Sequence, residues 1–193
     1  MNGYGEDADV LARQYESLEF ADVHAAVLHL FPAKPALVLD IGAGTGRDAA
    51  ALSRLGHRVV AVEPTAELRA YGQRAHPEPI EWIDDALPEV PVVLERFESF
   101  DLILLSAVWM HLDDQERAVG MKRLEGLLAV GGRIVMTLRH GPAPRNRRMY
   151  DVTVEETVAD ARRAGLACVH RSRGEDLLGR PELRWSYLAF ERF

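Results

Sequence analysis

Apolar runs alternate with amphipathic segments along most of this chain. Runs rich in leucine and β-branched residues predict strands at 38–41, 58–62, 80–83, 100–105 and 133–138, the last one introduced by Gly131 and Gly132. Helical patterns lie between these runs, including 48–55, 114–129 and 154–164. Strands that alternate with helices in this way favour an α/β fold with a parallel, doubly wound sheet.

The two ends of the chain depart from this alternation. Two further strands are expected near 167–172 and 185–192, and the stretch between them is too short for a crossover helix, so they should pair antiparallel. The first residues form helical segments at 8–16 and 20–31, which Pro32 and Pro35 close. We therefore expect one domain over 1–193, with a helical cap at 1–35 and a seven-stranded Rossmann-like core at 36–193.

Composition narrows the class of partner. A chain of 193 residues can bury a real core, but it is too short for a dehydrogenase with a separate substrate domain. With 23 Lys and Arg against 30 Asp and Glu, the net charge of -7 opposes broad binding to nucleic acid or to an anionic membrane. A single cysteine, Cys168, and the lack of a secretion signal or a long apolar span indicate a cytoplasmic protein. No metal-ligand spacing is visible in the sequence, so no metal is expected.

The strand at 38–41 runs into a glycine-rich turn, Gly42-Ala43-Gly44-Thr45-Gly46, and then into a helix. Glycine lacks a Cβ, so such a turn can be tight and its N–H groups can approach a ligand closely. A dinucleotide-binding turn would need a small residue at the sixth position of the glycine motif, where this chain has Arg47. The sequence therefore predicts a cofactor cradle of another kind.

The pattern G-x-G-x-G after V-L-D-I resembles motif I of the class I S-adenosylmethionine-dependent methyltransferases, and Arg47-Asp48 matches a recurrent G-R-D variant of it. The resemblance implies that S-adenosylmethionine is the cofactor and that the product is S-adenosylhomocysteine. It also implies that the turn and the residues beside it bind this cofactor, namely Asp40, Gly42, Ala43, Gly44, Gly46 and Arg47. Arg47 is further expected to bridge the turn and the cap.

Two later strand ends extend the resemblance. Glu63 ends the second strand, where a carboxylate can accept both ribose hydroxyls of an adenosine, and Pro64 would then lie against the adenine. The segment Asp84-Asp85-Ala86-Leu87-Pro88 is similar to the family's D-A-x-x-L-P region. By that similarity Asp85 is the expected partner of the adenine amine, with Asp84 as the alternative and the Ala86 amide as a donor to the ring.

The exit of the fourth strand, 106–112, is also similar to the corresponding region of this family. Ser106 and Ala107 are expected to contact the cofactor there. Relatives that methylate nucleobase amines or glutamine amides usually carry D/N-P-P-Y/F at this exit, and this chain has Ser106-Ala107-Val108-Trp109, which disfavours such acceptors. Tyr15 is expected to close the methionine end of the cofactor, as an N-terminal tyrosine often does in similar enzymes.

Methyl transfer from a sulfonium mainly requires an acceptor that is held in line. A base is needed only for a hydroxyl or a protonated amine, and His111 and His140 are the candidates because both follow strand ends. The loop after the fifth strand carries four arginines between 139 and 148, which suggests a small acceptor with an anionic group. A solvated loop is the alternative interpretation of those arginines.

Two other functions stay open on the sequence. A protein that binds S-adenosylmethionine without catalysis would share every cofactor residue and differ only at the acceptor site. A nicotinamide-dependent oxidoreductase would share the turn and Glu63, but the chain lacks an evident Tyr-x-x-x-Lys pair. Neither the acceptor nor the oligomeric state follows from the sequence.

Overall fold

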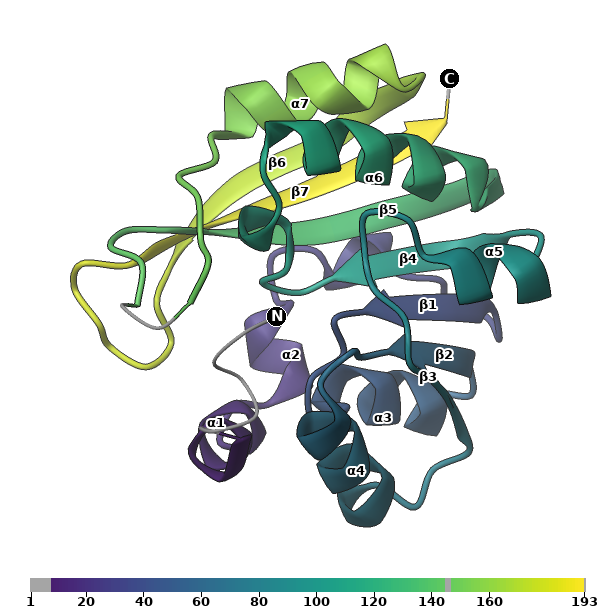
Figure 1. Ribbon diagram of the computed structural model, residues 1–193, viewed down its shortest axis with the longest axis vertical. Coiled ribbons are helices and arrows are strands. Elements are labelled where there is room, and N and C mark those ends of the chain that lie inside the picture. The colour runs from purple at the N-terminus through teal and green to yellow at the C-terminus, as the bar shows by residue number, and fades with distance from the viewer. Residues whose placement is uncertain (1–7, 145–146, 193) are drawn as a thin grey trace.

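The computed structural model describes residues 8–144 and 147–192. Its sheet has seven strands in the order β3-β2-β1-β4-β5-β7-β6 (Figure 1). The strands are β1 (Leu37–Ile41), β2 (Arg58–Val62), β3 (Ile80–Ile83), β4 (Phe100–Leu105), β5 (Leu128–His140), β6 (Leu166–Glu175) and β7 (Arg184–Arg192). Strands β1 to β5 run parallel, and β7 is antiparallel to both β5 and β6. The Rossmann-like sheet with a terminal antiparallel hairpin is thus confirmed.

Helices cover both faces of this sheet, as a doubly wound fold requires (Figure 1). The helices are α1 (Ala8–Glu16), α2 (Phe20–Val23), α3 (Arg47–Arg54), α4 (Ala66–Ala75), α5 (Pro91–Arg96), α6 (Asp114–Gly126) and α7 (Val154–Arg163), with short 3-10 turns η1 (Leu28–Leu30) and η2 (Trp109–His111). Helices α5, α6 and α7 pack their buried residues into the larger apolar cluster, on one face. Helix α3 and the N-terminal segment pack into the second cluster, on the other face.

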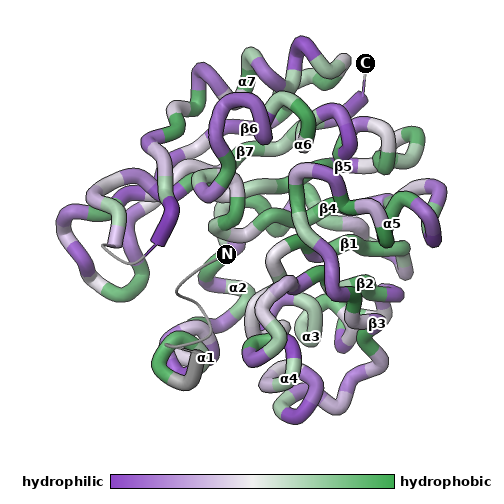
Figure 2. The backbone as a smooth tube through the Cα atoms, in the orientation of Figure 1, coloured by the Kyte–Doolittle hydropathy of each residue, from purple (hydrophilic) through white to green (hydrophobic). Residues whose placement is uncertain are grey.

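The core follows directly from the alternation of side chains along the strands. In β4, Ile103 and Leu105 belong to the first cluster, whereas Leu102 and Leu104 belong to the second. All four are fully buried, which is the pattern of a central strand covered on both sides. Figure 2 shows the same contrast, with mostly hydrophobic central strands and an alternating pattern along α7.

Two helices begin at reciprocal caps. The Asp113 side chain accepts from the Glu116 amide at 2.9 Å, and the Glu116 side chain accepts from the Asp113 amide at 2.8 Å. Thr153 and Glu156 repeat this arrangement at the start of α7. Each cap satisfies two backbone donors that a helix start leaves without a partner, so both crossover helices have sharply defined beginnings.

Several boundaries differ from the prediction, and one of them is the end of β5 at His140, which puts Arg139 and His140 in the strand rather than in the loop after it. Helix α6 ends at Gly126 rather than at 129, and β5 begins at Leu128, before the glycine pair. Leu127 and Leu128 are buried in the first cluster, and Leu128 pairs with Phe100 of β4, so packing extends the strand into the predicted helix. The second cap helix is also shorter than predicted, because α2 ends at Val23 and only the 3-10 turn η1 follows it.

The arrangement leaves the carboxyl ends of β1, β2 and β4 open at one edge, beside the N-terminal cap and the loops that follow β5 and β6 (Figure 1). Strand β1 pairs with β2 on one side and with β4 on the other, which makes this edge the switch point of the sheet. Ligands bind at such a point in open α/β sheets. Among the described residues, no helix is both long and apolar enough to cross a membrane.

Candidate functional site

A cavity of about 230 Å³ lies at this edge of the sheet. One half is lined by the glycine turn, the ends of β1 and β2 and the cap, and we call it the turn half. The other half is lined by β5, β7 and the loops that follow β5 and β6, and we call it the hairpin half. Of the residues predicted to bind cofactor or to act as a base, the lining includes Tyr15, Asp40, Gly42, Ala43, Gly44, Arg47, Glu63, Ser106, Ala107 and His111.

The glycine turn is built on left-handed backbone. Gly42, Gly44 and Gly46 have φ of 71°, 59° and 83°, a region that side chains with a Cβ rarely adopt. A Cβ on Gly44 would point at the Tyr15 ring at 3.7 Å, into the space between turn and cap. The turn amides differ from the sequence expectation, because Gly42 and Ala43 donate to the Val62 carbonyl. The absent side chain of Gly44, more than the N–H groups of Gly42 and Ala43, therefore leaves the space of the cavity beside the turn.

Glu63 closes the end of β2 against this turn. Its carboxylate is 3% exposed and accepts from the Gly44 amide at 2.8 Å and from the Thr65 amide at 2.7 Å. Burial raises the pKa of Glu63, while these amides and Arg69 oppose that rise. Each carboxylate oxygen has a second acceptor direction beyond the bond that it makes here. Glu63 can therefore hold the turn and accept from a ligand at once.

Asp40 is the most unusual acid of the cavity. Its carboxylate is buried and accepts from the Ala49 amide, but its Oδ2 atom has no partner among the described residues. Burial, followed by the negative charges of Asp48 and Glu63, raises the pKa of Asp40 well above its usual range. A buried acceptor without a donor is costly, so its presence at a cavity wall is a mark of ligand binding.

Arg47 connects the turn to the cap. Its Nε donates to Asp48 at 2.7 Å, and its Nη1 donates to the Tyr15 carbonyl at 3.2 Å, as the predicted bridge requires. His24 of the cap lies 2.8 Å from the other Asp48 oxygen. Burial alone would raise the pKa of Asp48, but the charges of His24 and Arg47 outweigh it and lower that pKa. This buried network fixes the cap over the glycine turn.

Tyr15 and Arg147 meet between the two halves. The Tyr15 side chain forms a hydrogen bond with Arg147, and burial raises its pKa despite the nearby positive charge. Arg147 belongs to the loop after β5, and it lines the cavity together with Arg139 of β5. Arg145 lies outside the described residues. The cap and the acceptor loop are therefore in direct contact at the cavity.

Several lining residues of the hairpin half were missed by the sequence reasoning. Trp185 and Tyr187 of β7 line the cavity together with Asp176 and Arg180 of the loop between β6 and β7. Asp176 accepts from Arg180 at 2.7 Å and from the Trp185 indole at 3.0 Å. The alternation Trp185-Ser186-Tyr187 was the available signal, because it puts two aromatic rings on one face of an edge hairpin.

The two candidate bases have different surroundings. His111 lines the cavity, and its Nδ1 lies 2.7 Å from the Arg148 carbonyl, whereas His140 is absent from the lining and lies 2.8 Å from the Ser186 hydroxyl. A carbonyl can only accept, so Nδ1 of His111 carries the proton of the neutral ring and Nε2 carries the lone pair. Burial lowers the pKa of both histidines.

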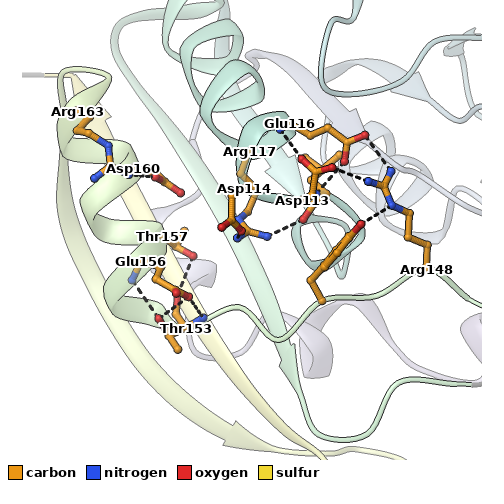
Figure 3. Close-up of polar contacts among 12 residues, drawn as sticks. Asp113, Asp114, Glu116, Arg117, Arg148, Thr153, Glu156, Thr157, Asp160 and Arg163 are labelled. Atoms are coloured by element: carbon orange, nitrogen blue, oxygen red, sulfur yellow. Dashed lines mark hydrogen bonds and ion pairs between the residues drawn. The ribbon is translucent and has the colours of Figure 1, made fainter.

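Arg148, whose carbonyl holds His111, anchors its loop to helix α6. Figure 3 shows its guanidinium between the two acids that cap this helix. It pairs with Asp113 at 2.8 Å and with Glu116 at 2.9 Å, and it also donates to the Tyr150 hydroxyl. The Tyr150 amide adds a bond to the Met110 carbonyl at 2.8 Å. The loop is therefore fastened beside His111.

The remaining predicted residues lie outside the cavity lining. Asp85 is buried and accepts from the Ala86 amide at 2.9 Å and from the Val93 amide at 3.0 Å, so its carboxylate fastens the start of α5. Asp84 is exposed and pairs with Arg69 at 2.8 Å. Pro64, Gly46, Ala86 and His140 complete this group. The expected contact of residues 84–86 with adenine stays a prediction.

Ser106 and Ala107 occupy the strand exit at the cavity wall. Ala107 has a φ of 59°, which is strained for a residue with a Cβ, and its amide donates to the Thr137 hydroxyl at 2.9 Å. Such strain is characteristic of functional sites. In the ranges 8–144 and 147–192, no group of three or more His, Cys, Asp or Glu side chains is placed to hold a metal ion.

The chain is similar in sequence to curated proteins that are described as methyltransferases. A protein of Alkaliphilus oremlandii, described as an uncharacterized methyltransferase, is 31% identical over 103 residues, which are 53% of this chain and 45% of that protein. An uncharacterized methyltransferase of Mycobacterium tuberculosis is 34% identical over 109 residues, which are 56% of this chain and 42% of that protein. The matched part is thus less than half the length of these relatives.

Solved structures share the fold. The 1,6-didemethyltoxoflavin-N1-methyltransferase of Burkholderia thailandensis, with 1,6-didemethyltoxoflavin and S-adenosylhomocysteine bound, has 24% identity and a TM-score of 0.69 over 100% of this chain and 91% of that chain. A TehB-like methyltransferase of Corynebacterium glutamicum has 19% identity and a TM-score of 0.72, with 97% and 99% coverage.

A protein-family model matches the central part of this chain. The model described as "Methyltransferase domain" matches residues 39–136, which include the glycine turn, Glu63 and the exit of β4. This range is about half of the chain and contains the residues on which the sequence resemblance rested. The chain therefore belongs to the methyltransferase domain family.

Proposed function

We propose that this protein transfers a methyl group from S-adenosylmethionine to a small-molecule acceptor that carries an anionic group. The observation that carries this proposal is the cavity, in which a cofactor cradle with an unpartnered buried acid adjoins a cationic and aromatic half. Membership of the methyltransferase domain family supports the cofactor, and the S-adenosylhomocysteine bound to the Burkholderia enzyme agrees with it.

The residues of the turn half fit this cofactor. Glu63 would accept the ribose hydroxyls, because its buried carboxylate retains acceptor directions beyond its two backbone bonds. Asp40 would face a positively charged group, since its Oδ2 atom lacks a donor and its surroundings favour a cation. Gly44 leaves room between the turn and Tyr15. Tyr15 would cover the cofactor from the cap side.

When bound, the cofactor supplies a methyl group on a sulfonium sulfur, and the S–C bond breaks as the bond from carbon to the acceptor forms. The task left to the protein is to orient the acceptor and exclude water, and orientation alone can contribute about 7 to 11 kcal/mol. Ser106 and Ala107 at the end of β4 lie between the two halves, where their backbone would set the position of the acceptor.

His111 is the residue that we propose as a base when the acceptor needs one. Burial lowers the pKa of His111, so its ring is neutral near pH 7 and carries a lone pair on Nε2. A hydroxyl or ammonium acceptor would pass its proton to this atom as the methyl group arrives. A carboxylate or thiolate acceptor has no such proton, and His111 would then only shape the cavity.

The anionic group of the acceptor is inferred from the arginines of the hairpin half. Arg139, Arg147 and Arg180 line the cavity, and guanidinium groups bind carboxylates and phosphates in a two-point geometry. Glu63, Asp40 and Asp48 lie in the turn half instead. The distribution of charge therefore favours a cationic ligand at the turn and an anionic ligand at the hairpin.

Calorimetric titration with S-adenosylmethionine, S-adenosylhomocysteine and NAD tests the proposal. We expect the first two to bind and NAD to give no heat. Glu63→Ala should weaken both by about 10-fold or more, because a charged acceptor contributes about 1.5–3 kcal/mol per hydrogen bond. Glu67→Ala changes a matched, exposed glutamate one turn away and should leave both affinities unchanged.

Methyl transfer itself is tested on a panel of small acids and their neutral amides or esters, with S-adenosylhomocysteine formation as the readout. Turnover confined to the acids supports the anionic acceptor. Cofactor binding without turnover on a broad panel would favour a binding protein over an enzyme. Binding of NAD alone would overturn the proposal.

A further inference from the structure

Four side chains form a continuous surface on one face of the paired strands β5 and β7. Thr137 pairs in register with Tyr187, and Arg139 pairs with Trp185. Alternate residues of a strand share a face, and partners in register lie side by side, so the four side chains are neighbours. All four line the cavity. We call this surface the β5–β7 patch.

The two aromatic rings of the patch are held in place by the protein itself. The Trp185 indole donates to Asp176 at 3.0 Å, and Asp176 is itself buried. The Tyr187 ring lies over Gly174 of β6, where an added Cβ would come within 2.8 Å of a ring carbon. Rings fixed in this way offer flat apolar surface with little loss of side-chain freedom on binding.

Arg139 supplies the charge of the patch. It donates to the Pro142 carbonyl at 2.8 Å and makes longer contacts with the Gly141 carbonyl and the Met149 sulfur. In the described ranges it has no ion pair with a carboxylate. Burial, followed by the positive charge of Arg180, lowers its pKa. Its guanidinium therefore lies partly buried beside two rings, in contact only with neutral groups.

The acids nearby do not compensate Arg139 at contact distance. Asp176 is committed to Arg180, with separations of 2.7 and 2.9 Å, and to Trp185. Glu175 is exposed at the rim of the cavity. An anion that entered the patch would thus meet the Arg139 guanidinium, which has no carboxylate partner in the described residues. One such positive charge suits a ligand with a single negative charge.

We infer that the β5–β7 patch is the acceptor subsite for an aromatic carboxylate, with its ring against Trp185 and Tyr187 and its carboxylate on Arg139. This inference rests on the proposed function and names the substrate class of that same site. An aliphatic carboxylate would use Arg139 but forgo the rings, and a neutral aromatic compound would use the rings but leave Arg139 without an anion. Both should bind more weakly than the aromatic acid.

Saturation-transfer NMR with minimal probes tests this inference. Benzoate, cyclohexanecarboxylate and benzyl alcohol are titrated into the protein, each with and without saturating S-adenosylhomocysteine. We expect benzoate to bind at least about 10-fold more tightly than either other probe, since each lacks one of the two recognised groups. We also expect tryptophan fluorescence to change with the two aromatic probes, and this change should be absent in Trp185→Leu.

Variants identify the residues responsible. Arg139→Gln should weaken benzoate and cyclohexanecarboxylate at least about 10-fold each and leave the affinity for benzyl alcohol unchanged. Trp185→Leu should abolish the preference for benzoate over cyclohexanecarboxylate. Arg173→Gln is the matched control, because Arg173 lies on the neighbouring strand β6, is exposed and is absent from the cavity lining, so its benzoate affinity should equal the wild type.

The outcomes separate this inference from the proposed function. Equal affinities for the three probes, or an Arg139→Gln variant that binds benzoate like the wild type while folded, would overturn the subsite. Folding of each variant is checked by its melting curve and by its S-adenosylhomocysteine affinity, which should stay unchanged. A protein that binds benzoate selectively but never S-adenosylhomocysteine would refute the cofactor and retain the anion site.

Discussion

The turn half and the hairpin half of the cavity carry opposite unpaired charges. In the turn half, the buried acid Asp40 has an oxygen without a donor among the described residues, and the basic Arg47 is committed to Asp48 and to the cap. In the hairpin half the acid Asp176 is fully engaged, and within 8–144 and 147–192 the basic Arg139 donates to neutral groups only. Each half therefore has one charged group that a ligand can pair with. The turn half suits a positive ligand group, and the hairpin half suits a negative one.

The halves also differ in the way that they are built. The turn half depends on backbone, because its shape comes from left-handed glycines and its acid Glu63 is held by two amides. The hairpin half depends on side chains, since its rings and guanidinium groups project from two paired strands and two loops. A backbone site is specific for one cofactor, whereas side chains can change with the acceptor while the fold stays the same.

Of the changes considered, a side chain added to the glycine turn should reduce cofactor affinity most. Gly44→Ala introduces a Cβ between the turn and Tyr15, in a backbone of φ 59°. We expect S-adenosylhomocysteine to bind at least about 30-fold more weakly, a loss of roughly 2 kcal/mol. We also expect a decrease in stability of about 1 kcal/mol from the left-handed conformation. Calorimetry and thermal unfolding measure the two effects separately.

Gly56→Ala controls for the backbone strain. Gly56 has a φ of 91°, and an added Cβ there meets nothing within 4 Å. It should lose a similar amount of stability while keeping full affinity for S-adenosylhomocysteine. If both variants lost affinity equally, the cradle would not be the reason for the loss, and the contrast between backbone and side-chain halves would fail.

Removing the acid of the hairpin half should disturb that half alone. Asp176→Asn puts an amide where two backbone N–H groups, Arg180 and Trp185 all donate. We expect hydrogen exchange at 177–183 to accelerate by about 10- to 100-fold, because the loop loses its central acceptor. The affinity for S-adenosylhomocysteine should change by less than about 2-fold. Equal losses in both halves would show that they are not independent.

The glycine turn and its strand-end acid could be predicted because they are local features. The alternation of strands and helices also followed from periodicity, and Gly42, Glu63 and the exit of β4 lie in one short stretch of sheet edge. The role of Asp85 could not be foreseen, since its bond to the Val93 amide spans a loop and a helix start. Sequence gives the residue type there, whereas the fold decides its partner.

The hairpin half was harder to predict for a geometric reason. Trp185 and Tyr187 face the cavity only because β7 pairs with β5 in one register, and a slip of one residue would turn both rings to the opposite face. The two candidate bases differ for a related reason: His111 follows β4 and lines the cavity, whereas His140 was expected after a strand but is the last paired residue of β5 and does not line it. Long-range register decides such cases, and no local pattern reports it.

The two halves should respond differently to pH, because the pKa of Asp40 in the turn half is raised and the pKa of Asp176 in the hairpin half is lowered. Burial raises the pKa of Asp40, so the free protein takes up a proton there at a higher pH than an ordinary carboxyl does, and a cationic ligand would oppose that uptake. S-adenosylmethionine affinity should therefore rise with pH and level off once Asp40 is ionised without ligand. Asp40→Asn should flatten this profile in calorimetric titrations.

Asp176 should behave in the opposite way. Its hydrogen bonds with Arg180 lower its pKa, so its contribution to stability is present above the unfolded value of about 3.9 and is lost as the pH falls toward the folded value. Protection of 177–183 should thus be constant from about pH 8 to about pH 5. If the S-adenosylmethionine affinity of the wild type did not change with pH, Asp40 would not be the group that faces the positive charge of the cofactor.

The smallest effect on stability is expected when Arg148 loses its exposed ion pairs, and Arg163, which also forms an exposed ion pair, serves as the comparison. Arg163 pairs with Asp160 within helix α7, whereas Arg148 joins the acceptor loop to Asp113 and Glu116 on α6 (Figure 3). Exposed ion pairs contribute little, so Arg148→Ala and Arg163→Ala should both melt within about 2 °C of the wild type. Only Arg148→Ala should lower the pKa of His111 further and loosen its Nδ1 bond in nitrogen NMR, because only that change releases the carbonyl that orients the ring and favours its charged form. Identical His111 signals in both variants would mean that Tyr150 and Met110 suffice to hold the loop, and that the hairpin half positions its base through backbone, as the turn half does.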